Sequence, residues 1–313
     1  MIANQSQEIL QVKDLTKVYG LEIRFGGKKI GRRVVGAQDV SFDIKRGEIF
    51  GFLGPNGAGK TTTMRSIMDY LHIKTGKITF FGRYDHHKDA LTVRKHISYV
   101  PGDVSLYQNM TGYDIIAYFN KFRPIDTEFV EELKSQFRVD LSLKIGQLSK
   151  GNRQQVALIV ALAPKPELLI MDEPTSGLDP LMAANFHKII KKLAKEGITI
   201  FLSSHDLAEV QSVCDRVGII KEGRMIIIEH IDNLKLEFMQ NITIKFSESK
   251  IPSEEDIRSL RSVISFEKEN KTLCKLKIKE NVNELIRWLA NYDVERLTIE
   301  DATLEDIFLQ YYE

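Results

Sequence analysis

The spacing of apolar and polar residues in the first two thirds of the chain predicts strands and helices in turn. Short apolar or alternating segments predict strands at 9–12, 37–44, 48–53, 77–81, 168–171 and 198–202. Apolar residues at helical spacing predict helices at 61–71, 113–122, 127–137, 152–162 and 183–195. Strands that alternate with helices are typical of an α/β core with a parallel sheet, here interrupted by a helical insertion at about 104–163.

The pattern changes after Glu229. Four short strands are predicted at 242–246, 264–267, 274–278 and 294–299, with helices at 254–262 and 282–292 between them. The resulting order, β-α-β-β-α-β, matches the ferredoxin-like split unit and is followed by a closing helix at 304–311. We therefore expect a domain at 1–229 and a small α+β accessory or regulatory domain at 230–313.

Composition narrows the classes of function. The 313 residues include 44 basic and 43 acidic ones, a balance that argues against a dedicated nucleic-acid binder. Two isolated cysteines, Cys214 and Cys274, give no disulfide framework and favour a reducing cytoplasm. Apolar runs such as 156–163 are far shorter than the ~20 residues that span a bilayer. If the protein works at a membrane, we expect another chain to supply the membrane part.

A phosphate-binding loop is the clearest motif. The segment Gly54-Pro55-Asn56-Gly57-Ala58-Gly59-Lys60-Thr61 fits G-x-x-x-x-G-K-[ST] and lies between a predicted strand and a predicted helix. Glycines let backbone N–H groups curl round phosphate oxygens, and the helix adds its positive end. We expect Lys60 to reach the β- and γ-phosphates, Thr61 to ligate Mg²⁺, and Thr62 to join the nucleotide site. The alternative is a glycine-rich turn that arose by chance.

Two carboxylates end the predicted strand at 168–171. Asp172 is placed to join the coordination sphere of Mg²⁺, and Glu173 to polarise the attacking water as a general base. Taken alone, this pattern is equally compatible with an ordinary turn at a strand end.

A third motif, Leu148-Ser149-Lys150-Gly151-Asn152, opens the helix predicted at 152–162. The Ser149 hydroxyl and the free N–H groups beside it form a second helix start suited to an anion. An ordinary serine cap of a helix has the same pattern.

In this order, the motifs resemble the ABC ATPase family. The phosphate loop corresponds to Walker A, 168–173 to Walker B, and 148–152 to the signature usually written LSGGQ, from which Lys150 and Asn152 depart. Residues 176–179 correspond to the D-loop, and His205 to the switch histidine. The resemblance covers about 8–229.

The resemblance implies a P-loop NTPase core with an antiparallel N-terminal β subdomain, and ATP and Mg²⁺ as cofactors. It implies a head-to-tail homodimer in which Ser149 and Gly151 of one copy complete the ATP site of the other, with His205 at the γ-phosphate. The ending at 302–312 looks like that of ATP-binding subunits of prokaryotic exporters. We therefore expect an ATPase subunit, with no nucleic-acid partner, on the inner face of the cell membrane beside a separate permease. The alternatives are a soluble translation- or DNA-associated ABC ATPase and an ATP-binding regulatory module.

Besides the signature, the sequence departs from the family at Gly102 and at an insertion, and it offers two candidates for the adenine platform. Gly102 stands where the family has a glutamine that touches Mg²⁺, and Asp103, the next residue, is the candidate replacement. Tyr19 is the favoured adenine platform, with Phe25 as a competitor. An insertion at 24–33 carries five basic residues, which suits either a solvated hairpin or a contact with anionic lipid headgroups.

Overall fold

The chain divides into two compact units, Met1–Glu229 and His230–Glu313. The computed structural model describes residues 8–20, 23–25, 28–30, 33–237, 240–248, 250–278 and 282–301. Within these ranges no helix has the length and apolar character needed to cross a bilayer. The closing helix predicted at 304–311 lies outside the described residues.

The larger unit begins with an antiparallel sheet in the order β4-β1-β6-β7. Strands β1 (Glu8–Tyr19) and β4 (Val34–Lys45) pair over most of their length and are longer than the strands predicted at 9–12 and 37–44. Side chains of β1 beyond Leu15 are exposed or half-buried, so backbone pairing rather than core burial continues this strand. The remaining strands of this region are β6 (Thr75–Phe80) and β7 (Tyr84–Asp85), with a separate hairpin of β2 (Ile23–Phe25) and β3 (Lys28–Ile30).

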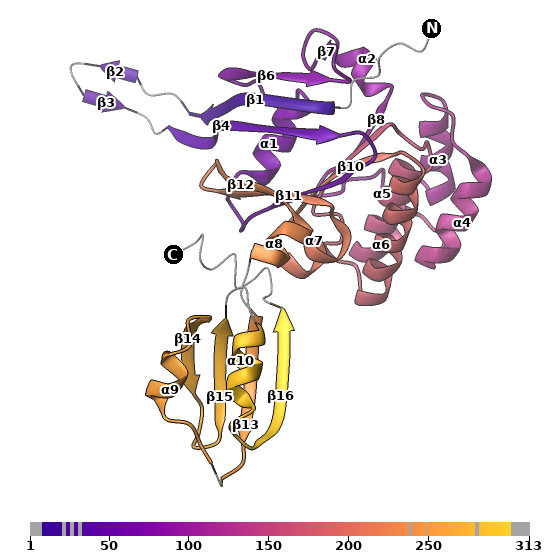
Figure 1. Cartoon of the computed structure of the whole chain (residues 1–313). Helices are drawn as coiled ribbons and strands as arrows, with labels where there is room; N and C mark the ends of the chain where they lie inside the picture. Colours follow the sequence, from indigo (N-terminus) through magenta and orange to yellow (C-terminus); the bar gives the residue numbers. More distant parts are fainter. Residues whose placement is uncertain are drawn as a thin grey trace, which may run out of the picture. The chain divides into compact units, whose positions relative to one another are not determined.

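The second sheet has six strands in the order β12-β11-β5-β10-β9-β8. Strands β12, β11, β10 and β8 of this sheet are labelled in Figure 1. The four pairs from β11 to β8 are parallel, and every residue of β5, β9 and β10 is buried. Such continuous burial is typical of parallel strands covered on both faces. The bounds are β5 (Ile49–Leu53), β8 (Ile97–Val100), β9 (Leu168–Asp172), β10 (Thr199–Ser204), β11 (Arg216–Lys221) and β12 (Arg224–His230).

Four phenylalanines join the two sheets. The ring of Phe42 in β4 lies 5.5 Å from Phe50, 5.6 Å from Phe52 and 5.5 Å from Phe201, measured between centroids. Aromatic pairs at such distances add about 0.5–1.5 kcal/mol each beyond the area they bury. The cluster therefore fixes β5 and β10, whose carboxyl ends carry the candidate site.

The helical region contains α3 (Gly112–Asn120), α4 (Thr127–Phe137) and α5 (Lys150–Leu162), within two residues of the predicted helices. Each begins at a polar cap, because the side chains of Thr111, Asp126 and Ser149 accept hydrogen bonds from N–H groups of the first turn. The other helices of the larger unit are α1 (Lys60–Ile67), α2 (Ala90–Arg94), a 3₁₀ turn η1 (Ile145–Gln147), α6 (Pro180–Lys195) and α7 (Leu207–Val213).

The smaller unit holds an antiparallel sheet in the order β14-β15-β13-β16. After α8 its elements follow the predicted order β-α-β-β-α-β. Alternate residues of β13 and β15 pack with residues of α9 and α10 in one apolar core, which leaves polar residues on the opposite face of the sheet. The bounds are α8 (Ile231–Glu237), β13 (Gln240–Phe246), α9 (Glu254–Arg258), β14 (Val263–Lys268), β15 (Leu273–Ile278), α10 (Val282–Leu289) and β16 (Val294–Asp301).

Candidate functional site

The glycine-rich loop connects β5 to α1 and wraps round the Lys60 side chain. The φ angle of Gly59 is 107°, and a Cβ there would lie 2.4 Å from the carbonyl oxygen of Gly36, so only glycine fits. The Lys60 ammonium donates to the carbonyl oxygens of Gly54 at 2.6 Å and Pro55 at 3.1 Å. The loop therefore surrounds the Lys60 ammonium, and its backbone N–H groups together with this positive charge suit the binding of phosphate.

The two carboxylates of Walker B lie at the end of β9, beside this loop. Glu173 Oε1 lies 3.3 Å from Lys60 Nζ. Ser203 in the neighbouring strand β10 donates its hydroxyl to Asp172 Oδ1 at 2.6 Å and accepts the backbone N–H of Glu173 at 3.0 Å. Ser203 thus holds both acidic residues in place. Sequence reasoning missed it, because the contact depends on the register that sets Ser203 opposite Asp172.

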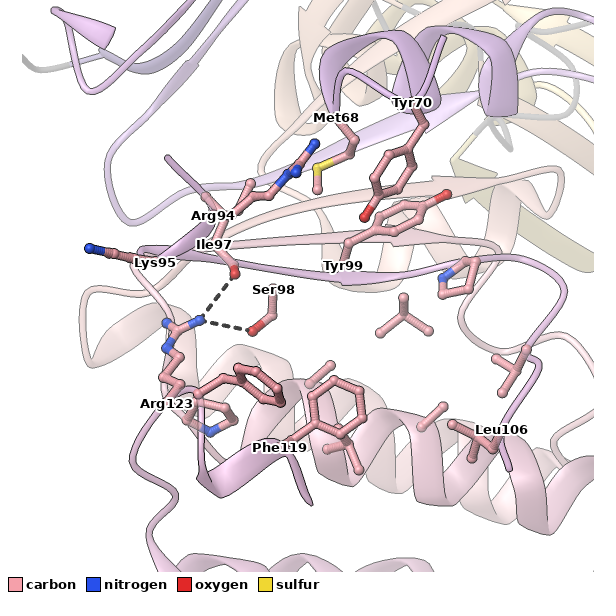
Figure 2. Close-up of a pocket in the computed structure, with 18 of the residues that line it drawn as sticks. Met68, Tyr70, Arg94, Lys95, Ile97, Ser98, Tyr99, Leu106, Phe119 and Arg123 are labelled. Carbon is pink, nitrogen blue, oxygen red and sulfur yellow. Dashed lines mark hydrogen bonds between the residues drawn. The ribbon is translucent and has the colours of Figure 1, made fainter. Parts of the chain in front are cut away.

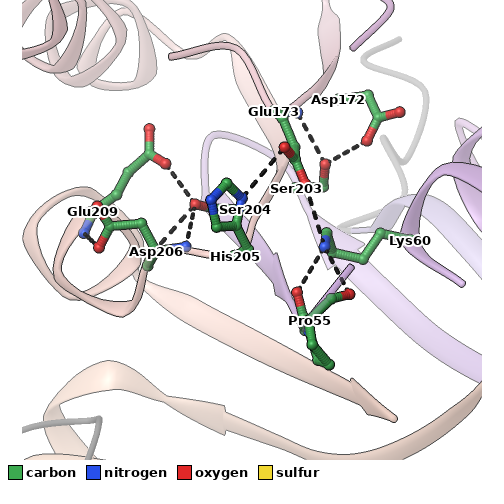
Figure 3. A network of polar contacts seen from close by, with 10 residues as sticks. Pro55, Lys60, Asp172, Glu173, Ser203, Ser204, His205, Asp206 and Glu209 are labelled. Carbon is green, nitrogen blue, oxygen red and sulfur yellow. Dashed lines mark hydrogen bonds and ion pairs between the residues drawn. The ribbon is translucent and has the colours of Figure 1, made fainter. Parts of the chain in front are cut away.

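His205 follows β10 and completes a chain of polar contacts (Figure 3). Its Nδ1 lies 3.3 Å from Glu173 Oε2, and more than half of its side chain is exposed. Hydrogen bonds hold the residues on either side of it, since Ser204 donates to Glu209 at 2.6 Å and Asp206 caps α7. Lys60, Glu173 and His205 are far apart in sequence, and they meet at the carboxyl ends of the parallel strands β5, β9 and β10.

The residues predicted to hold Mg²⁺ offer the hard oxygen ligands that this ion prefers, a hydroxyl of Thr61 and a carboxylate of Asp172. Asp172 is buried, and a Cβ placed on Gly102 would lie 3.3 Å from its Oδ2. A side chain at 102 would therefore begin beside both the backbone carbonyl oxygen and the carboxylate of Asp172. Asp103 is exposed, and among the described residues no hydrogen bond or ion pair joins it to Asp172 or Thr61.

Tyr19 lies beside the first turn of α1. Its hydroxyl is 3.2 Å from Thr62 Oγ1, and its ring lies against Gly36, where a Cβ would come within 2.6 Å of Tyr19 Cε2. The Lys17 ammonium lies over the ring at 5.1 Å from its centroid. Tyr19 is thus an exposed aromatic next to the phosphate loop. The side chain of its competitor Phe25 lies outside the described residues.

The signature segment packs on the D-loop instead of on the phosphate loop. Ser149 accepts the N–H of Asn152 at 3.1 Å and caps α5. A Cβ on Gly151 would lie only 2.5 Å from the carbonyl oxygen of Gly177 in the D-loop. Within the part of the chain that the structure describes, no hydrogen bond or ion pair joins 148–152 to 54–61. One copy of the chain therefore presents two separate halves of the predicted nucleotide site.

A cavity of about 580 Å³ lies between β8 and the helical region (Figure 2). Its walls are mainly apolar, and Arg123 at its rim donates to Ile97 O at 3.0 Å. Tyr99 packs edge-on against Tyr70 in the wall, 5.7 Å between centroids. Burial and then the charge of Asp172 raise the pKa of Tyr99 to about 12, so its hydroxyl stays protonated at neutral pH. The cavity wall thus reaches the surroundings of the Walker B carboxylate.

Comparison with known proteins adds independent evidence. A family model described as "ABC transporter" matches residues 37–176. An uncharacterised ABC transporter ATP-binding protein of Methanocaldococcus jannaschii is 30% identical, over 93% of this chain and 100% of that protein. The bacitracin transport ATP-binding protein of Bacillus licheniformis is 36% identical, over 72% of this chain and 71% of that protein. A dimeric ATP-binding cassette solved in a post-hydrolysis state with ADP and Pi is 23% identical, with a TM-score of 0.59 over 71% of this chain and 99% of that chain.

Proposed function

Because this chain belongs to the ABC transporter ATP-binding proteins, we propose that it hydrolyses ATP to drive a separate membrane permease. The observation that carries this proposal is the meeting of Lys60, Glu173 and His205 at one edge of the sheet. The Glu173 carboxylate, which can act on water, lies within contact of both the Lys60 cation, which suits phosphate, and the His205 imidazole. Phosphoryl transfer to water uses such a cation on the phosphates and such a residue to position and activate the attacking water.

In the proposed reaction, Lys60 releases its contacts with the carbonyl oxygens of Gly54 and Pro55 and with Glu173, and its ammonium binds the γ-phosphate instead. Glu173 then accepts a proton from the water that attacks the γ-phosphorus, the bond between the γ-phosphate and ADP breaks, and ADP and phosphate are the products. Ser203 keeps this carboxylate in position through its contact with the Glu173 backbone. His205 orients Glu173 through Nδ1 and reaches the phosphate from its exposed side. Mg²⁺, bound with ATP by Thr61 and Asp172, would neutralise phosphate charge. Tyr19 would stack on the adenine, next to Thr62.

We propose that the complete site forms between two copies of the chain. The phosphate loop of one copy and Ser149 and Gly151 of the other would enclose each ATP, in a head-to-tail homodimer. The separation of the two halves within one copy supports this arrangement. The dimeric form of the solved cassette with the same fold is consistent with it.

The permease partner and export are also proposed. Relatives include ATP-binding proteins named for bacitracin transport and linearmycin resistance, which suit efflux of a harmful compound. The cavity between β8 and the helical region, whose walls are mainly apolar, is the surface where a permease segment would dock. A subunit that drives such a permease would work on the cytoplasmic face of the membrane.

Purification from native membranes tests the partnership. A tagged chain should bring down a multi-spanning membrane protein, and a Phe119→Asp change in the cavity wall should release it. The same change should leave basal ATP hydrolysis of the purified chain intact, since Phe119 lies away from Lys60 and Glu173. Recovery of the chain with ribosomes or DNA instead would contradict the transporter assignment.

A further inference from the structure

The smaller unit ends its sheet with an unshielded strand. β16 is the last strand in the order β14-β15-β13-β16, and only one of its sides is paired, with β13, among the described residues. It is eight residues long, contains no proline, and pairs with β13 without interruption from Arg296 to Asp301, with one bulge at Glu295. Natural edge strands are usually short, bulged or covered, because a free row of backbone groups is a template for another strand. β16 therefore offers a surface for pairing.

The side chains of β16 differ between its two faces. Leu297 and Ile299 lie opposite Ile244 and Ile242 of β13, on the face that packs against the helices. Their neighbours in β13 are fully buried, whereas Leu297 and Ile299 are each 39% exposed. The apolar layer of this domain thus continues to the edge of the sheet and remains half-open there.

The opposite face of β16 carries charge in a symmetric pattern. Arg296 and Glu300 flank Thr298 at equal spacing, and all three lie on the polar face of the sheet. No ion pair engages Arg296 or Glu300 within the described residues. The positions of Arg296 and Glu300 are therefore complementary to those of the same two residues in a second, antiparallel copy of the strand.

We propose that β16 pairs in antiparallel fashion with β16 of a second copy of this chain, about a two-fold axis at Thr298. Arg296 then faces Glu300 of the partner copy, and Leu297 faces Ile299 of the partner copy, each pair occurring twice. The two four-stranded sheets become one sheet of eight strands, and the half-open apolar edge is covered.

Other registers fit less well. Moving the axis by one residue sets Glu295 opposite Ile299, or Leu297 opposite Asp301. In the register centred on Thr298, Glu295 lies at the end of the paired segment, at the bulge of β16, and its carboxylate forms an ion pair with Lys245 at 2.7 Å. Both apolar pairs and both ion pairs therefore occur together only in that register.

This contact goes beyond the proposed ATP-dependent dimer, since it involves the smaller unit alone and needs no nucleotide. It is therefore tested in the full chain without ATP, where the nucleotide site contributes nothing. Cross-strand neighbours in an antiparallel pair lie close enough for a disulfide. Cys214 and Cys274 are buried, and burial raises the pKa of both thiols, so they do not compete in mild oxidation.

Thr298→Cys should give a disulfide-linked dimer on mild oxidation of the nucleotide-free chain. Thr243→Cys is the matched control, because Thr243 is the neighbour of Thr298 on the same face but one strand in from the edge. Equal, low yields from the two variants would overturn the proposal. Cross-linking of Thr298→Cys that appears only after removal of 302–313 would also overturn it, because it would mean that this segment occupies the free side of β16 in the full chain.

Charge reversal tests the register. Arg296→Glu should weaken the nucleotide-free dimer about tenfold by sedimentation, because both ion pairs become like-charge pairs. The double variant Arg296→Glu/Glu300→Arg should restore it, since each pair is rebuilt with its charges exchanged. A dimer insensitive to Arg296→Glu, or a double variant as weak as the single one, would contradict this register.

Discussion

Lys60 and His205 both contact Glu173, one at each carboxylate oxygen. This carboxylate is the group that can accept a proton from water in the proposed site. Glu173→Gln keeps its size and hydrogen-bonding positions but removes the base. We expect ATP turnover to fall by about 10²- to 10⁴-fold while ATP still binds. Steady-state phosphate release and ATP binding on the same preparation measure the two effects.

A second glutamate in the same strand region provides the control. Glu167 lies just before β9 and pairs with Arg46 at 2.9 Å, away from the phosphate loop. Glu167→Gln should leave turnover close to that of the unmodified chain. Near-normal turnover in Glu173→Gln would refute the assignment of this residue as the base.

Substitutions at Asp103 and Gly102 test which of these two positions can supply a ligand for Mg²⁺. A side chain at position 102 would lie beside Asp172, but glycine has no side chain that could ligate Mg²⁺ there. Asp103 is proposed to supply that ligand. We expect Asp103→Ala to raise the Mg²⁺ concentration for half-maximal turnover by about tenfold. Adding Gly102→Gln to this variant should recover part of the loss. Unchanged Mg²⁺ dependence in Asp103→Ala would remove Asp103 from the site.

At the scale of elements, the start of α5 and the D-loop are tightly matched. A Cβ on Gly151 would come within 2.5 Å of the Gly177 carbonyl oxygen, so Gly151→Ala must push the two segments apart. We expect turnover to fall by about a hundredfold with the fold intact, because small displacements of positioning groups cost that much. Phosphate release and the far-UV circular dichroism spectrum measure the two properties.

Gly146→Ala is the matched change for this test. It lies in η1, just before the signature, with its nearest contact at 3.2 Å from the added carbon. Its turnover should stay within a few-fold of the original. Equal losses in the two variants would mean that the Gly151 contact has no special role.

The hairpin of β2 and β3 carries the proposed lipid contact. Five basic residues, Arg24, Lys28, Lys29, Arg32 and Arg33, lie in or beside it. Replacing all five with Gln should weaken binding to anionic vesicles, since each contributes on the order of 1 kcal/mol near such a surface. Replacing four exposed lysines of α6 with Gln, at 188, 191, 192 and 195, provides the comparison. Vesicle sedimentation with no difference between the two variants would end this proposal.

Helices and strands could be predicted best from the sequence where a short motif, such as a polar helix cap, marks where they begin. Helices α3 and α4 begin at polar caps, and their predicted starts lie within one residue of the observed ones. Strands β11 and β12 are absent from the predicted elements, although Glu222 and Gly223, with φ of 49° and 79°, form a two-residue turn that could have revealed them.

Contacts between distant strands could not be predicted in the same way. The motifs identified Lys60, Asp172 and Glu173, because each motif lies within one short segment. The support from Ser203 depends on the parallel register of β9 and β10, which no local pattern specifies. The packing of Gly151 on Gly177 likewise requires two segments, 26 residues apart, to be placed in space.

For the whole molecule, the central claim is that each ATP site is shared between two copies. Within one copy, the phosphate loop and Ser149 belong to separate groups of contacts. In a head-to-tail pair, a copy that lacks Lys60 and a copy that lacks Ser149 would place both defects in one site. The other site would then be built from an intact phosphate loop and an intact signature.

Mixing Lys60→Ala with Ser149→Ala tests this claim most directly. Each variant alone should be inactive. The equimolar mixture should recover about a quarter of the original ATP hydrolysis, because half of the dimers are mixed and each has one intact site of two. A mixture that stays as inactive as the separate variants would contradict a shared site.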